Sequence, residues 1–209
     1  MERREAVKYI SILLGGTLVG ADAFLSGCKS DTAKPGEWST DDIAYLNEIG
    51  ETILPQTSTP GAKAANVGQF MTVMVNDCYE EEEQKAFREG MDKLNDASKK
   101  KFNKSFMEST PEQRTQLLVA LDQEAREYQK KVSDFNKNET QKEKDEMAKG
   151  NKDYKKQRMS PHYFSLMKQL TLLGYFTSEV GQTKALRYVP VPGKFEGCIP
   201  YKKGDKAFA

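Results

Sequence analysis

The sequence predicts a mainly α-helical protein, an irregular helical bundle that ends in an extended C-terminal tail containing Pro and Gly. Apolar residues recur at helical spacing (i, i+3, i+4, i+7) in several separate segments between residues 40 and 178. Helix-start signals, in which capping residues precede acidic residues or Pro, stand before most of these segments. Beyond Leu186, repeated Pro and Gly exclude a helix, and the aromatic and β-branched residues between them favour extended backbone.

Two helices are expected at the start of this region. Ser39 to Asp42 supply hydroxyl groups that cap a helix and acids that suit its N-terminal dipole, and Pro55 ends the helix. The Pro- and Gly-containing segment 55–68 predicts a loop. The next helix is expected from Val67 to Tyr79, and its apolar stripe consists of Val67, Phe70, Met71, Met74, Val75 and Cys78. This spacing predicts that Cys78 faces the core, as a small hydrophobe.

The middle of the chain continues the helical pattern. Phe87, Met91 and Leu94 mark a weaker amphipathic helix, whose leading acids Glu80–Glu83 suit a helix N-terminus better than a Ca²⁺ loop. The clearest helix start follows: Thr110 as cap, Pro111 at the first position and Gln113 completing a capping box. The inward face of this helix is expected to consist of Leu117, Leu118, Leu121 and Ala125.

Residues 129–158 differ from the rest in being densely charged and poor in apolar residues. Such a segment buries little surface to offset the entropy of ordering its backbone. Two readings remain open, an exposed helical extension or a mobile insertion. Basic residues could bind anionic lipid, but the acidic residues of the segment dilute their charge.

A last helix is expected to start at Ser160–Pro161, a cap followed by a first-turn Pro. His162 would then lie in its first turn, as a surface or capping group. The apolar residues of this helix are Tyr163, Phe164, Met167, Leu170, Leu173 and Tyr175. Gly174 and Thr177–Ser178 indicate where it breaks, before a short turn that reaches Gly181.

Composition and motifs exclude several functions. The net charge of +1, with Lys and Arg mixed among Glu and Asp, gives no basic patch of the kind that binds nucleic acid. His162 is the one His of the chain, so a His-rich metal site is excluded. Neither a nucleophile elbow nor a phosphate-binding or dinucleotide-binding glycine loop occurs. We therefore predict a chain that is not itself an enzyme.

Residues 1–28 have the layout of an export signal, with a charged start, an apolar run and a finish of small residues. Arg3 and Arg4 resemble the twin-arginine export pattern. Leu25 to Cys28 resemble a lipobox, in which Cys28 would carry a lipid anchor; the alternative is an ordinary secretory signal with an incidental Cys. The polar residues 29–38 would form a tether, and residues 39–209 the helical domain.

Two further cysteines remain if Cys28 is lipidated. In an oxidising compartment Cys78 and Cys198 could bond to each other, bond to a partner, or stay as thiols. The aromatic side chains Tyr175, Phe176, Tyr188 and Phe195 are candidates for a partner interface, because Tyr and Phe are enriched there. The alternative is that they close the core of the domain itself.

Two sequence blocks resemble the gluconate 2-dehydrogenase subunit 3 family, the small subunit of FAD-dependent sugar dehydrogenases. The first block includes Ile53 to Pro55, Thr59 to Ala62 and Val67 to Phe70. The second includes the sequence GYFTSE at residues 174–179, with Gly181, and continues through Tyr188 and Pro192–Gly193 to Gly197–Cys198. The resemblance covers residues 40–128 and 160–200. The charged segment 129–158 matches nothing in the family.

The resemblance implies a non-catalytic accessory subunit of a flavin-dependent sugar or polyol dehydrogenase. The FAD would belong to a large subunit of the glucose-methanol-choline type, and this chain would hold no cofactor. The small subunit would carry the folded partner through the twin-arginine route and stay bound to it, with a cytochrome c subunit in some complexes. The complex would be periplasmic or in the cell envelope, anchored to the membrane by lipid at Cys28. The alternative is a free-standing helical lipoprotein with a scaffold role.

Overall fold

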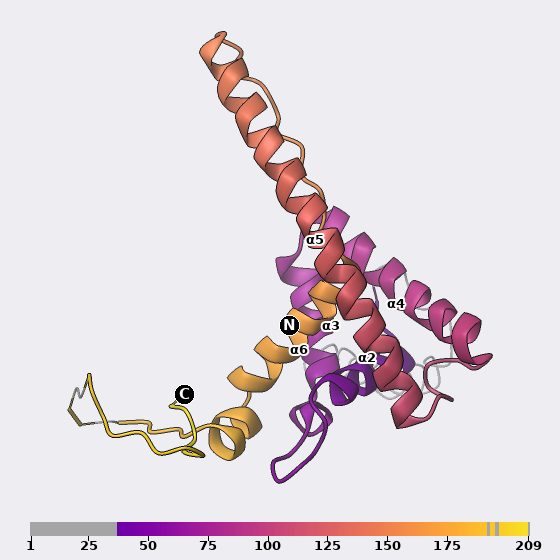
Figure 1. Ribbon diagram of the computed structural model, residues 1–209, viewed down its shortest axis with the longest axis vertical. Helices are drawn as coiled ribbons and strands as arrows, with labels where there is room; N and C mark the ends of the chain where they lie inside the picture. The colour runs from indigo at the N-terminus through magenta and orange to yellow at the C-terminus, as the bar shows by residue number, and fades with distance from the viewer. Residues whose placement is uncertain (1–36, 192, 195–196, 209) are drawn as a thin grey trace, which may run out of the picture. The chain divides into compact units, whose positions relative to one another are not determined.

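The computed structural model describes residues 37–191, 193–194 and 197–208. The chain divides into two units, Met1–Ser39 and Thr40–Ala209, and the described helices lie in the second. They are α2 (Thr40–Ile53), the 3-10 helix η1 (Ala62–Ala65), α3 (Val67–Cys78), α4 (Glu81–Phe102), α5 (Pro111–Ala148), α6 (Tyr163–Thr177) and the π-helical η2 (Gly181–Ala185) (Figure 1). Extended pairing in the described residues amounts to one isolated bridge, between Arg187 and Phe208. The predicted mainly helical class is confirmed.

Helix α6 is the centre of the packing, because it contacts α2, α3, α4 and α5. Phe164, Met167, Leu170 and Thr171 on this helix are each at most 2% exposed. Burying an apolar side chain of this size contributes about 1.5–3 kcal/mol, so these positions anchor the core. The inward faces of the other helices agree with the predicted stripes, since Phe87, Met91 and Leu94 on α4 and Leu117, Leu118, Leu121 and Ala125 on α5 are all buried.

Two of the predicted helix starts are confirmed. Helix α2 begins at Thr40 with Asp41 and Asp42 in its first turn. At the start of α5, the Gln113 amide donates to Thr110 Oγ1 (3.3 Å) and the Thr110 amide donates to Gln113 Oε1 (3.0 Å), which completes the capping box. Both signals are local, so the backbone needs no distant contact to form them.

The predicted start of the last helix at Ser160–Pro161 is wrong. Helix α6 begins at Tyr163, and the cap is His162, whose Nδ1 accepts a hydrogen bond from the Phe164 amide (3.3 Å). The backbone before it is held elsewhere, because the Met159 amide donates to Asn136 Oδ1 of α5 (3.3 Å). Burial lowers the pKa of His162, which favours the neutral ring that can accept this bond.

Cys78 is exposed and not buried as its spacing predicted, although it lies on the same side of α3 as Met71 and Val75. The buried residues of α3 are Val67, Gly68, Met71, Thr72 and Val75. Cys78 is the last residue of the helix, and the chain turns to extended backbone at Tyr79. The periodic stripe therefore continues one residue past the region where other helices cover it.

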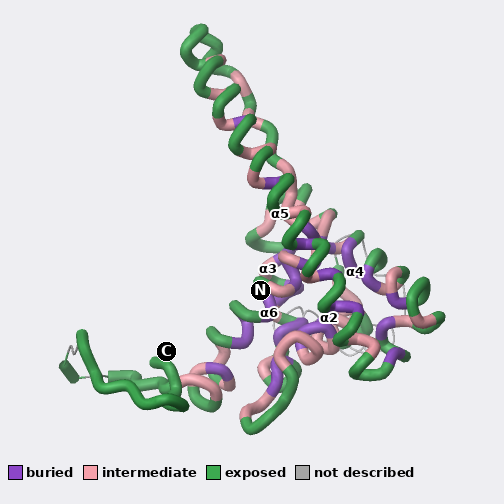
Figure 2. The backbone as a smooth tube through the Cα atoms, in the orientation of Figure 1, coloured by how far each residue is buried: buried purple, intermediate pink, exposed green. Residues whose placement is uncertain are grey.

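The charged segment is an exposed helical extension, the first of its two predicted readings. Residues 129–148 continue α5 beyond the helices that pack on its first half, and residues 149–160 return alongside it without regular structure (Figure 1). We call residues 129–160 the arm. Figure 2 shows most of its backbone as exposed. The buried residues of the arm are Val132 and Glu139. No helix in the described part of the chain has the length and apolarity that crossing a membrane requires.

An ion pair joins the start of α5 to α2. Arg114 pairs with Glu48, and their side chains are only 12% and 19% exposed. The same guanidinium donates to the carbonyl oxygens of Phe106 (2.9 Å) and Met107 (2.6 Å), and Lys63 Nζ lies 2.8 Å from the Glu48 carboxylate. Burial alone would raise the pKa of Glu48, but the Lys63 hydrogen bond and the charges of Arg114 and Lys63 outweigh it and hold this pKa below its ordinary value.

We predict that Arg114→Leu lowers the free energy of unfolding by about 2–3 kcal/mol, because it leaves the Glu48 carboxylate with Lys63 as its one charged partner and removes the donor to two carbonyl groups. Urea unfolding at pH 7, followed by circular dichroism, measures the change. Arg126→Leu on the same helix is the control: Arg126 pairs with Asp122 but is 75% exposed, so its loss costs no more than about 1 kcal/mol.

The difference in unfolding free energy between the wild type and Arg114→Leu should also depend on pH. Because the folded pKa of Glu48 lies below 4.5, the pair stabilises the protein above about pH 4.5 and loses this effect as the pH falls through the lowered pKa. The difference in unfolding free energy between the wild type and Arg114→Leu should therefore decrease as the pH is lowered. A gap that stays constant down to acid pH would show that packing, and not the ion pair, is responsible.

Candidate partner-binding surface

The C-terminal end of α6 holds the second family-like block, and most of its residues have structural roles. A Cβ atom added at Gly174 would lie 2.6 Å from Phe70 Cδ1, so Gly174 allows α3 and α6 to approach closely. Tyr175 is 4% exposed, and its hydroxyl donates to the carbonyl oxygen of Pro60 (2.6 Å). This bond ties the end of α6 to the turn that follows α2.

The chain after α6 is fixed by hydrogen bonds to the last turn of the helix. Ser178 Oγ donates to the Tyr175 carbonyl (2.7 Å) and accepts from the Gly181 amide (3.0 Å). Gln182 Nε2 donates to the Phe176 carbonyl (2.9 Å). A Cβ atom at Gly181 would collide with the Tyr175 carbonyl oxygen, so only glycine fits this approach. The block therefore fixes the backbone on which Phe176 is presented.

The first family-like block is a loop locked to α2. The Glu51 carboxylate accepts hydrogen bonds from the amides of Gln56 and Lys63, both at 2.8 Å. The Ala62 amide donates to the Leu54 carbonyl (2.9 Å), and Ala62 is fully buried. A Cβ atom at Gly61 would meet the Glu51 carboxylate, which accounts for glycine in this turn.

Exposed apolar side chains gather toward the C-terminal end of the described chain. On α6, Leu172, Leu173 and Phe176 are 37%, 43% and 37% exposed, and we call these three the α6 patch. Their spacing of i, i+1 and i+4 puts them on one side of the helix. The tail, residues 186–208, adds further exposed apolar side chains: Tyr188, Val189, Val191, Ile199, Tyr201 and Phe208. Large exposed apolar surface of this kind typically marks an interaction site.

The predicted interface residues separate into two groups. Tyr175 belongs to the core, so for this residue the alternative reading applies: it closes the domain itself. Phe176 is 37% exposed and Tyr188 is 53% exposed, and both are available to a partner. Phe195 lies outside the described residues, as do Arg3, Arg4 and Cys28.

Sequence reasoning missed Leu172 as a surface residue and assigned Leu173 to the apolar core of α6. The signal was present in the sequence, because the run from Leu170 to Phe176 is apolar on more sides than one buried face requires. Cys78 and Cys198 are free, exposed thiols in this structure, which is one of the three alternatives that the sequence left open. A bond from Cys198 to a partner stays a prediction.

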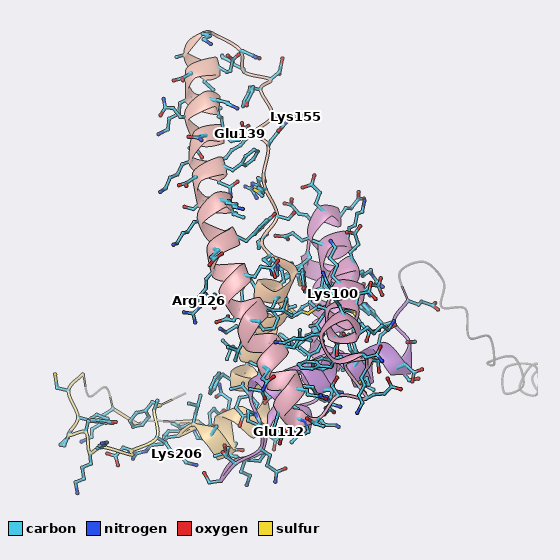
Figure 3. The ribbon with its side chains drawn as sticks, turned by 45° about the vertical axis from the view of Figure 1, so that its right-hand side comes forward. Lys100, Glu112, Arg126, Glu139, Lys155 and Lys206 are labelled. Atoms are coloured by element: carbon cyan, nitrogen blue, oxygen red, sulfur yellow. The ribbon has the colours of Figure 1, made fainter. Side chains whose placement is uncertain are left out.

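The tail makes its described contacts mainly with itself and with η2. The Arg187 amide donates to the Ala207 carbonyl (2.8 Å), and the Arg187 guanidinium lies 4.6 Å from the centroid of the Phe208 ring. Lys206 donates to the carbonyl of Lys184, and Figure 3 shows Lys206 in this region. A depression here is lined by Thr183, Leu186, Arg187, Tyr188, Asp205 and Lys206. Among the described residues, no group of three or more His, Cys, Asp or Glu side chains could hold a metal ion.

The two family-like blocks lie at the turn after α2 and at the end of α6, and the Tyr175–Pro60 hydrogen bond joins them. The family model described as gluconate 2-dehydrogenase subunit 3 matches residues 40–193. This chain belongs to that family, which confirms the resemblance seen in the sequence. Comparisons with curated proteins and with solved structures found no match.

We predict that Tyr175→Phe lowers the free energy of unfolding by about 1 kcal/mol, because it removes the hydrogen bond to the Pro60 carbonyl while keeping the ring. Thermal or urea unfolding measures this. Tyr188→Phe, at a 53% exposed position, is the matched control and should leave stability unchanged. Equal effects of the two substitutions would contradict the role given to the Tyr175 hydroxyl.

Proposed function

We propose that this chain is a non-catalytic accessory subunit that binds, exports and anchors a large dehydrogenase subunit of the glucose-methanol-choline type. The observation that carries the proposal is the family match over residues 40–193. The large subunit would hold the FAD and oxidise a sugar or polyol, and this chain would hold no cofactor. In some complexes a cytochrome c subunit would take the electrons onward.

The chemistry of the cofactor explains why the complex would be exported in a folded state. A flavin is inserted into its enzyme in the cytoplasm, so the loaded large subunit must cross the membrane already folded. One twin-arginine signal, at Arg3 and Arg4 of this chain, would serve both subunits if they bind before export. After export, a lipid on Cys28 would hold the complex on the periplasmic or cell-envelope side of a membrane.

The α6 patch and Tyr188 are the surface that we assign to the large subunit. Leu172, Leu173 and Phe176 stand on backbone fixed by the contacts of Gly174, Tyr175 and Gly181, so little entropy is lost when they are covered. Burying these side chains in a partner removes apolar area from water, which is the usual source of affinity at the centre of an interface.

We predict that Leu172→Ser, Leu173→Ser and Phe176→Ser combined abolish recovery of the large flavoprotein with this chain. A pull-down from detergent-solubilised membranes, read by flavin absorbance and mass spectrometry, measures recovery. The control combines Val73→Ser, Met107→Ser and Val119→Ser, three apolar side chains elsewhere that are more exposed than the patch (47%, 44% and 64%), and should leave recovery unchanged.

The outcomes of this pull-down separate the proposals. Flavoprotein recovered equally with both variants would move the interface away from the α6 patch but keep the accessory role. A wild-type chain that is recovered alone would contradict the accessory role and favour the alternative, a free-standing scaffold lipoprotein.

We predict that Arg3→Lys combined with Arg4→Lys leaves both this chain and the large subunit in the cytoplasm. The Lys pair keeps the positive charge, so the change tests the twin-arginine signal itself and not the charge at the start of the chain. Cell fractionation with immunodetection of both subunits gives the result. Continued export of the pair would refute the carrier role.

A further inference from the structure

The arm is built so that three of its six acidic side chains, Glu139, Glu143 and Glu146, face inward. Asn136, Glu139, Glu143 and Glu146 follow one another at spacings of three and four residues, so they share one face of α5. Glu139 is the most enclosed, at 3% exposure. Its carboxylate accepts hydrogen bonds from Lys142 Nζ (2.7 Å), the Tyr154 hydroxyl (2.9 Å) and the Gln157 amide (3.3 Å). In Figure 3, Glu139 lies on α5 and Lys155 on the returning segment beside it.

The neighbouring acids of the arm are also bound within it. Glu146 accepts from Lys149 Nζ (2.9 Å) and Asn151 Nδ2 (3.0 Å), and Asp145 accepts from Gln141 Nε2 (2.8 Å). Glu143 lies 3.9 Å from Lys156 Nζ. Four of the six acidic side chains of the arm are therefore used to hold the helix, its last turn and the returning segment together.

The basic side chains are distributed differently. The arm has ten Lys and Arg residues, and three of them (Lys142, Lys149 and Lys156) pair with its acids. The other seven are exposed and form no ion pair with any described residue: Lys130, Lys131, Lys137, Lys144, Lys152, Lys155 and Arg158. The outer surface of the arm is therefore strongly positive, although its composition is mixed.

Three of these lysines form a regular row. Lys130, Lys137 and Lys144 are spaced by seven residues, which places them on one face of α5 at intervals of about 10 Å. This face is opposite the one that carries Glu139. We call the three the lysine stripe. Ser133, Gln141 and the acidic Asp134 lie between them on the same side, so this face carries three positive charges and one negative charge.

We propose that the lysine stripe binds the anionic lipid headgroups of a membrane surface. Clustered Lys side chains are attracted to the negative potential of such a surface. A protein partner fits this face poorly, because interface cores are depleted in Lys and rely on aromatic and apolar side chains. Those side chains lie instead in the α6 patch and the tail.

The dimensions of the chain are compatible with this contact, given the lipid anchor of the proposed function on which the inference rests. Residues 29–38, fully extended, allow at most about 40 Å between Cys28 and the start of the helical domain at Ser39. The helical part of the arm, residues 129–148, is about 30 Å long. The lipid anchor would therefore hold the start of the helical domain, to which the arm belongs, no farther than this from the headgroups.

The test is binding of the purified full-length chain to lipid vesicles, with Cys28→Ala so that no lipid is attached. Vesicles of phosphatidylcholine alone are compared with vesicles of equal parts phosphatidylcholine and phosphatidylglycerol, by co-sedimentation. Lys130→Gln, Lys137→Gln and Lys144→Gln are combined in one variant, because Gln keeps helix propensity and removes charge. The control combines Lys100→Gln, Lys104→Gln and Lys203→Gln, an equal charge loss at exposed positions outside the arm.

We expect the unsubstituted arm to bind the anionic vesicles and the stripe variant to bind them on the order of 100-fold more weakly, at roughly fivefold per Lys. The control variant should stay near the wild type, and binding should weaken as salt is raised. Equal losses in the two variants, or equal binding to both kinds of vesicle, overturn the proposal. Loss of the large flavoprotein by the stripe variant, with vesicle binding unchanged, overturns it in favour of a protein contact.

If the proposed accessory function is wrong, the pull-down shows it and the vesicle measurement does not. A chain that recovers no flavoprotein from membranes would refute the accessory role and leave the vesicle measurement standing. Circular dichroism of the stripe variant shows whether α5 is intact. A double variant, Lys130→Gln with Lys144→Gln, keeps Lys137 and should lose less vesicle binding than the triple variant.

Discussion

The hydrogen bond from the Tyr175 hydroxyl to the Pro60 carbonyl joins segments 115 residues apart, and much of the C-terminal structure depends on it. It fixes the loop after α2 against the end of the central helix. Gly174 brings α3 onto the same turn through Phe70, and Gly181 folds the following chain back against the Tyr175 carbonyl. At Gly174 and Gly181 these contacts leave no room for a larger side chain. The exposed side chain of Phe176 thus projects from backbone that is held on both sides.

The arm shows how a charged sequence can be ordered without a hydrophobic core. The buried face of α5 is apolar at Leu121 and Ala125, still apolar at Val132, and polar from Asn136 onward. Hydrogen bonds to Glu139 and Asn136 replace apolar burial along the returning segment. Charged acceptors strengthen such bonds, and the Lys142 and Tyr154 hydrogen bonds hold the pKa of Glu139 below its ordinary value. The carboxylate is therefore ionised at neutral pH, as this arrangement requires.

Local sequence signals were sufficient to predict that the helices exist. Contacts between residues distant in sequence decided where α6 begins and which side chains are buried. The starts of α2 and α5 depend on residues within four positions of the cap, so the sequence contained the complete signal. The start of α6 shifted to Tyr163 because Asn136 of another helix holds Met159. Periodicity gave Cys78 the correct face but could not show that the covering helices end before it. The core position of Tyr175 required knowledge of its partner Pro60.

The same limit applies to the two candidate surfaces. Phe176 and Tyr188 were predicted from residue type, but Leu172 and Leu173 were not, because a Leu in an amphipathic pattern counts as core until the packing is known. For the arm, composition suggested that acids dilute the positive charge. The structure separates most of them, since Glu139, Glu143 and Glu146 face inward while Lys130, Lys137 and Lys144 face outward with Asp134 as the one acid between them. Charge counted along a sequence does not give the charge of a surface.

These two surfaces differ in the physics of what they can bind. The α6 patch gains affinity by removing apolar area from water, which depends little on salt and requires a partner of matching shape. The lysine stripe would gain affinity by electrostatic attraction, which acts over about a Debye length and is weakened by salt. Any flat anionic surface can supply the opposite charge. One chain can therefore hold a specific protein and a non-specific surface at once without the two competing. In the accessory role that we propose, this combination would keep a bound enzyme near a membrane, while the contacts that recognise the enzyme would stay independent of lipid composition.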